Sequence, residues 1–138
     1  MQLEHADAVA DKGWYGCQWA AASPIWIGYA NKGIDEPHVH AQITEIYLIA
    51  RGTAEIRIEQ ETIALTAGDL LVVEPGEAHT FLASSADYFH FVLHTSGSAS
   101  EIAQPAKFAV SRARLGLSHV KGCHRMDNES RTESCAIR

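Results

Sequence analysis

The sequence is poor in basic residues and has no apolar stretch long enough to span a membrane. Its 138 residues include 11 lysines and arginines against 17 aspartates and glutamates, which gives a formal net charge of -6. Nucleic-acid-binding domains gather Lys and Arg into stripes or patches, and no such gathering is visible here. No run approaches the roughly 20 apolar residues of a transmembrane helix. We therefore expect neither nucleic-acid nor membrane partners.

Cysteines are also few. Cys17, Cys123 and Cys135 are an odd number at wide spacing, which is typical of reduced thiols in a cytosol and not of a disulfide framework. The first residues, 1–12, have no basic start followed by an apolar core, so they do not read as a secretory signal. These absences favour a cytoplasmic protein.

The length fits one domain that can bury its own core without disulfides. We expect this domain over residues 1–117, with its core at 14–95, a short N-terminal arm, and a polar tail at 118–138 that lacks periodicity. Residues 107–117 fit either a strand or a short helix.

Short segments of alternating polarity, separated by Gly and Pro, dominate the rest of the chain. Residues two apart in a strand share a face, so alternation over four to eight residues predicts a half-buried strand. About eight such strands predict an all-β antiparallel sandwich or barrel. The expected strands are 14–19, 24–30, 45–50, 53–58, 62–65, 70–73, 79–83 and 88–94.

The candidate metal ligands are His38, His40, Glu45 and His79. Imidazole nitrogen and carboxylate oxygen together are suited to a divalent transition metal. His38 and His40 share a face of an extended segment, but Glu45 is an odd number of residues beyond His40. Residues 41–44 must therefore bend, bulge or change strands for Glu45 to join the histidines.

Two weaker catalytic candidates lie on neighbouring strands. Tyr47 shares a face with Glu45 and would reach a bound substrate, although an aromatic residue in a strand is more often part of the core. His90 could act as a donor to a ligand or as a general base if it faces inward. The opposite face carries Phe89, Phe91 and Leu93, which is the more natural lining, so we expect His90 to face outward.

The first half of the motif resembles the first signature of the cupin superfamily. Gly33 is followed after four residues by His38-x-His40, after four more by Glu45 and after six more by Gly52. The usual signature has five residues after the first glycine, so this chain is one shorter there.

The second half resembles the second cupin signature. It consists of Gly68, five residues, Glu74-Pro75-Gly76, two residues and His79. The proline lies one place later than in the usual signature. The asparagine that often ends this signature is replaced by Ala83, so its role in orienting ligands is missing.

The resemblance covers about residues 25–95 and implies a small single-domain cupin of the conserved-barrel type. Its fold would be a jelly-roll barrel, a double-stranded β-helix, and its usual state a homodimer; the apolar outer residues Ile46 and Leu48 agree with a covered face. The metal ligands would be His38, His40, Glu45 and His79, with one Fe, Mn, Ni, Zn, Co or Cu ion.

Cupins include enzymes and binders, so the resemblance does not choose a function. The complete ligand set favours a metal-dependent dioxygenase or isomerase that acts on a small molecule. The alternative is a non-enzymatic module that binds or senses a small ligand. Outside the expected barrel no segment is long enough for a DNA-binding helix pair, which disfavours a transcriptional regulator.

Overall fold

The computed structural model describes residues 1–16, 25–95 and 107–117. The three cysteines and the expected tail at 118–138 lie outside the described residues. Within these ranges the chain forms strands and turns without a helix, so none of its described segments could cross a membrane as a helix. The strands are β1 (Lys12–Trp14), β2 (Ile25–Ala30), β3 (His38–His40), β4 (Thr44–Arg51), β5 (Thr53–Ile58), β6 (Glu61–Thr66), β7 (Leu70–Val73), β8 (His79–Ser84), β9 (Phe89–Thr95) and β10 (Lys107–Ala109).

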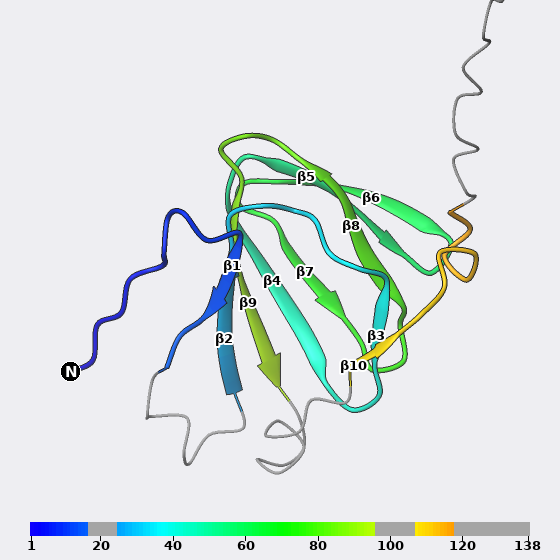
Figure 1. Cartoon of the computed structure of the whole chain (residues 1–138), viewed down its shortest axis with the longest axis horizontal. Coiled ribbons are helices and arrows are strands. Elements are labelled where there is room, and N and C mark those ends of the chain that lie inside the picture. The colour runs from blue at the N-terminus through cyan, green and yellow to red at the C-terminus, as the bar shows by residue number, and fades with distance from the viewer. Residues whose placement is uncertain (17–24, 96–106, 118–138) are drawn as a thin grey trace, which may run out of the picture.

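The strands form two antiparallel sheets that make the opposite walls of a barrel (Figure 1). The first sheet has the order β1-β2-β9-β4-β7, and the second has the order β10-β3-β8-β5-β6. The chain passes repeatedly from one sheet to the other, as in a jelly roll, so strands that pair are often far apart in sequence. The all-β jelly-roll prediction is confirmed.

Glycines allow the tight turns that the sequence predicted. Gly52 has φ +69° where β4 of the first sheet passes into β5 of the second, and Gly68 has φ +97° between β6 and β7. L-residues with a side chain rarely adopt this left-handed conformation, so glycine suits both positions.

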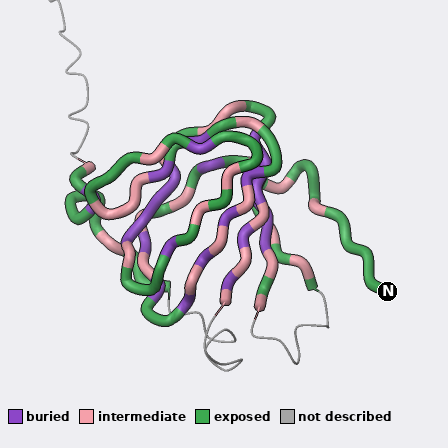
Figure 2. The backbone as a smooth tube through the Cα atoms, turned by 180° about the vertical axis from the view of Figure 1, so that it is seen from behind, coloured by how far each residue is buried: buried purple, intermediate pink, exposed green. Residues whose placement is uncertain are grey.

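The core lies between the sheets and follows the alternation of the strands. Along β4, Tyr47 and Ile49 are buried while Ile46 and Leu48 are only half-buried. Figure 2 shows the same alternation as purple and paler segments along the strands. The inward residues form one apolar cluster, whose buried members are Tyr47, Ile49, Ala54, Ile56, Leu65, Val73, Phe81, Tyr88 and Val92.

The first and last strands of the barrel differ in part from those that the sequence predicted. The first strand is Lys12–Trp14, whereas we expected a strand at 14–19. The residues of that range beyond 16 lie outside the described residues. Residues 107–117 begin with a strand, β10, which pairs with β3 so that Lys107 lies opposite His40. This pairing places Lys107 near the candidate metal ligands.

The outward side of the first sheet is largely apolar, with the polar residues Thr44, Arg51 and Thr95 at the ends of its strands. The strand registers align its outward side chains in rows across β2, β9, β4 and β7. We call this surface the outer apolar face; it comprises Ile25, Ile27, Tyr29, Ile46, Leu48, Leu70, Val72, Phe89, Phe91 and Leu93. Leu70 and Val72 are 60% and 40% exposed, so part of this face is open to solvent in the single chain.

Candidate metal centre

Two cross-strand pairs build the candidate centre, one on each sheet. In the second sheet, His38 of β3 lies directly opposite His79 of β8. In the first sheet, Glu45 of β4 lies directly opposite His94 of β9. Directly opposed residues on one face of an antiparallel pair hold their side chains about 5 Å apart. The two pairs face each other across the interior of the barrel.

The segment between His40 and Glu45 resolves the parity problem posed by the sequence. Ala41 and Gln42 form a bend, and the chain then enters β4 in the other sheet. His40 and Glu45 are both buried, with 4% and 3% exposure. The expected change of strand is confirmed, and it turns Glu45 toward the histidines.

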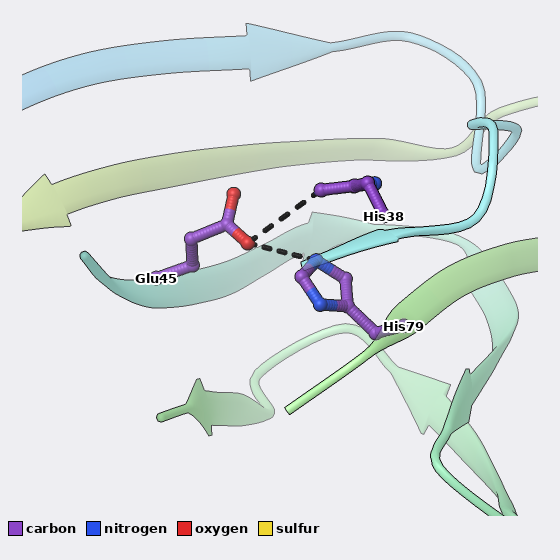
Figure 3. A group of neighbouring side chains, drawn as sticks. All are labelled: His38, Glu45 and His79. Carbon is purple, nitrogen blue, oxygen red and sulfur yellow. Dashed lines mark ion pairs between the residues drawn. The ribbon is translucent and has the colours of Figure 1, made fainter. Parts of the chain in front are cut away.

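Four imidazoles converge on the two oxygens of Glu45. Its Oε2 lies 2.7 Å from His79 Nε2 and 3.8 Å from His38 Nε2 (Figure 3). Its Oε1 lies 2.7 Å from His94 Nε2 and 3.6 Å from His40 Nε2. The structure thus brings together all four residues of the sequence motif and adds His94.

The backbone assigns the protonated nitrogen of two of these rings. Nδ1 of His38 lies 2.8 Å from the carbonyl oxygen of Glu36, and Nδ1 of His79 lies 3.1 Å from that of Glu77. A carbonyl only accepts, so each Nδ1 carries the proton and donates it. The other ring nitrogen of each residue, Nε2, is directed toward the carboxylate of Glu45. Metal-binding histidines commonly have this arrangement.

The carboxylate of Glu45 also fits a cation. Within the described part of the chain, its buried Oε2 has no hydrogen-bond partner, and the same holds for Nδ1 of His40. Oε2 and His79 Nε2 lie 2.7 Å apart, so a cation could bind to both of these ligand atoms. Two overlapping groups can hold an ion, His38-Glu45-His79 and His40-Glu45-His94. Nitrogen and carboxylate oxygen suit divalent transition metals, so the donor set matches the expected ion.

The electrostatics of the cluster keep the carboxylate charged and His40 neutral. Burial alone would raise the pKa of the Glu45 carboxyl, but its contacts with His38, His79 and His94 hold this pKa well below its usual range. Burial lowers the pKa of His40 to about 4, against a smaller raising effect of Glu45. A metal ligand must be free of its proton, so both states favour metal binding near neutral pH.

The orientation of β9 differs from the sequence expectation. His90 is buried, and His90, Val92 and His94 face into the barrel. The aromatic face, which we expected to be the lining, instead belongs to the outer apolar face, where Phe89 stacks with Tyr29. The prediction of an outward His90 is therefore wrong: β9 turns His90, Val92 and His94 inward, and its aromatic side chains pack on the outer side against residues such as Tyr29. His94 was missed for the same reason, although it shares a face with His90 in the sequence.

His90 and Tyr47 both lie inside the barrel, near the cluster. The Tyr88 hydroxyl lies 2.7 Å from His90 Nδ1, and the His90 ring stacks on Phe81. Burial lowers the pKa of His90 to about 4, so its ring is neutral near pH 7. Tyr47 belongs to the apolar core, as expected, but its hydroxyl also lies 3.3 Å from His79 Nε2. Burial raises the pKa of Tyr47 well above its usual value, so the hydroxyl keeps its proton.

A cavity of about 450 Å³ connects this cluster with the surface. Its buried part includes His40, Glu45 and His94, and its walls include Tyr47 and Phe81. The volume lies within the range that proteins use for small molecules. A ligand in this cavity would therefore lie against the candidate metal site.

The barrel and its buried histidine cluster define a protein of the cupin class. Within that class, the family model of the AraC-like ligand binding domain matches residues 24–109. This match spans more than half of the chain, and the chain belongs to this family. A search of curated proteins gave no match.

Solved structures with the same fold support the assignment to the cupin class. A cupin 2 conserved barrel domain protein from Salinispora arenicola is 14% identical, covers 75% of this chain and 96% of its own, and has a TM-score of 0.56. A cupin protein from Bacteroides fragilis is 24% identical over 72% of this chain and 89% of its own, with a TM-score of 0.51. KdgF from Halomonas sp. is 18% identical over 64% and 80%, with a TM-score of 0.53. At these identities the similarity is one of fold.

Proposed function

We propose that this chain is a small metal-dependent enzyme that holds one divalent transition metal ion with His38, His40, Glu45 and His79 and acts on a small molecule beside it. The observation that carries the proposal is the convergence of imidazole nitrogens on Glu45, whose Oε2 has no hydrogen-bond partner among the described residues, beside a cavity of about 450 Å³. Four protein ligands leave about two positions open in an octahedral shell, as in catalytic sites. The ion would be Fe, Mn, Ni, Zn, Co or Cu. Bound there, it would supply Lewis-acid or oxygen chemistry.

Between the two expected reaction types, the residues favour a dioxygenase over an isomerase. An isomerase commonly moves protons with a side chain whose pKa lies near the working pH. Neither expected catalytic candidate meets this requirement in the metal-free protein, because burial lowers the pKa of His90 to about 4 and raises that of Tyr47 well above its usual value. A dioxygenase relies more on its metal. In this role, Tyr47 would donate a hydrogen bond to the bound molecule, and His90 would orient it.

The alternative is a module that binds a small ligand without converting it. The family description, a ligand binding domain, favours this function. Thermal unfolding separates the two possibilities when it is combined with product analysis. A compound that raises the melting temperature but stays chemically unchanged in the presence of metal and oxygen indicates a binder, because ligands of the folded state stabilise it.

We further propose a cytoplasmic homodimer joined through the outer apolar face. The exposed residues Leu70 and Val72 support this arrangement, since monomeric proteins rarely leave large apolar patches in water. A two-fold interface needs one surface that matches itself, and a flat apolar sheet suits this requirement.

The metal site is tested by replacing two of its ligands. His38→Ala and His79→Ala each remove one nitrogen ligand, so we expect metal content to fall from near one ion per chain to below about 0.1. Elemental analysis after dialysis measures this content. His5→Ala is the matched control, because His5 is exposed and distant from the cluster in sequence. Retention of the ion by both ligand variants would exclude the site.

A further inference from the structure

The open end of the cavity is rich in lysine, although the chain as a whole is acidic. Lys12, Lys32 and Lys107 line it together with Asp35, in a chain whose net charge is -6. Lys32 is paired with Asp11, at 2.6 Å between Nζ and Oδ1. Lys12 and Lys107 instead share a single carboxylate, so this group of three residues has a net charge of +1.

Lys12 and Lys107 come from different sheets and meet at Asp35. Lys12 Nζ lies 3.1 Å from Asp35 Oδ1, and Lys107 Nζ lies 3.2 Å from Asp35 Oδ2. Although burial opposes it, these ammonium groups lower the pKa of Asp35, which therefore stays ionised. In the described structure each ammonium makes this one contact, whereas an ammonium group has three donors. Both have donors left for another anion.

These two ion pairs contribute little to the stability of the fold. Lys12 and Lys107 are 61% and 41% exposed, and ion pairs at such exposed sites add little to the stability of a fold. Because they lie beside a cavity, the same two ammonium groups can also attract a ligand of opposite charge. Low-dielectric walls focus the field of charges at the opening of a cleft, which concentrates ligands of opposite charge.

The residues that line the cavity indicate the chemical character of the uncharged part of the ligand. Trp14, Tyr47, Phe81 and Val92 line the cavity, and Phe81 lies nearly parallel to the ring of His90. Flat, apolar walls favour an aliphatic or aromatic body. A bound divalent ion would add positive charge at the buried end.

We propose that the cavity takes a small organic carboxylate with an apolar or aromatic body, whose carboxylate lies between the ammonium groups of Lys12 and Lys107. This proposal rests on the proposed function, because it names the class of molecule that the same site takes. The body of the ligand lies against the apolar walls of the cavity, beside Phe81.

Paired probes separate charge from shape. Calorimetric titration with benzoate and hexanoate is compared with titration by benzamide and hexanamide, which have similar shapes without the charge. We expect the acids to bind at least about tenfold more tightly than the amides, and raising the salt concentration to weaken only the acids. Equal affinity of acids and amides, or no binding of either acid, would overturn the proposal.

Variants of the two lysines test the location of the carboxylate. In the double variant Lys12→Gln with Lys107→Gln, we expect benzoate affinity to fall about tenfold while amide binding and metal content stay unchanged. The double variant with arginine at both positions keeps the charge and should keep acid binding. Arg112→Gln, which removes an exposed charge outside the cavity, is the matched control. Unchanged acid binding in the glutamine variant would place the carboxylate elsewhere.

The same titrations on chelator-treated protein separate this proposal from the proposed function. Lysine-dependent binding of benzoate without metal supports the carboxylate site even if the metal content of the wild type proves negligible. A protein that holds its ion but binds acids and amides alike keeps the metal site and loses the carboxylate proposal.

Discussion

Glu45 is the residue on which the candidate centre depends, because its two oxygens face different pairs of histidines. Oε2 is close to His38 and His79, while Oε1 accepts a hydrogen bond from His94 Nε2 at 2.7 Å. The bond from His94 leaves Oε2 as the oxygen without a partner among the described residues. His94 therefore orients the carboxylate.

This role predicts how His94 variants behave. Residues that hold a metal ligand in place typically contribute 10–100-fold to metal affinity. We expect His94→Ala to weaken metal binding by about this factor, while His94→Gln, whose amide can donate to Oε1, retains most of it. Competition with a chromogenic chelator measures the affinity, and circular dichroism checks the fold. Equal affinity of the alanine variant and the wild type would disprove the role.

At the scale of elements, the passage from β4 to β5 is a crowded turn at the end of β4 away from Glu45. Gly52 has a positive φ, and a Cβ there would collide with the Ser85 hydroxyl and approach the Tyr88 Cα to 2.9 Å. Gly68 has a positive φ as well, but no atom lies within 4 Å of the position of its missing Cβ. Comparing substitutions at the two glycines therefore separates the cost of backbone strain from the cost of crowding.

We expect Gly68→Ala to lower the free energy of unfolding by about 1 kcal/mol, the cost of the left-handed conformation alone. Gly52→Ala should cost about 2–4 kcal/mol, because crowding adds to that strain. Urea unfolding of both variants gives the comparison. Similar losses at the two positions would mean that the β4–β5 turn relaxes and is not crowded.

At the scale of the whole molecule, the outer apolar face predicts the oligomeric state. We expect light scattering to give the mass of two chains for the wild type at micromolar concentration. Leu70→Lys combined with Val72→Lys should shift this mass to one chain, because burying two unpaired ammonium groups in an interface is costly. Glu55→Lys, at an exposed position of the second sheet, is the control and should remain dimeric. A wild type with the mass of one chain would contradict the homodimer.

The sequence by itself was enough for the fold and for most members of the cluster. Alternation over β4 predicted that Tyr47 shares the face of Glu45, because residues two apart in a strand share a face. Glycine at 52 and 68 marked turns for a local reason, its tolerance of positive φ. The spacing of His38, His40 and Glu45 identified the residues that the bend at Ala41 and Gln42 brings together.

Only the tertiary structure decided which face of β9 points inward and which charges surround the cavity. His94 joins the cluster because β9 pairs with β4 in the register that sets it opposite Glu45, and both faces of β9 are apolar enough to be covered. Lys12 and Lys107 meet at Asp35 because their strands lie at the edges of different sheets. Local alternation determines that two faces differ, but contacts between distant segments determine which face is inside.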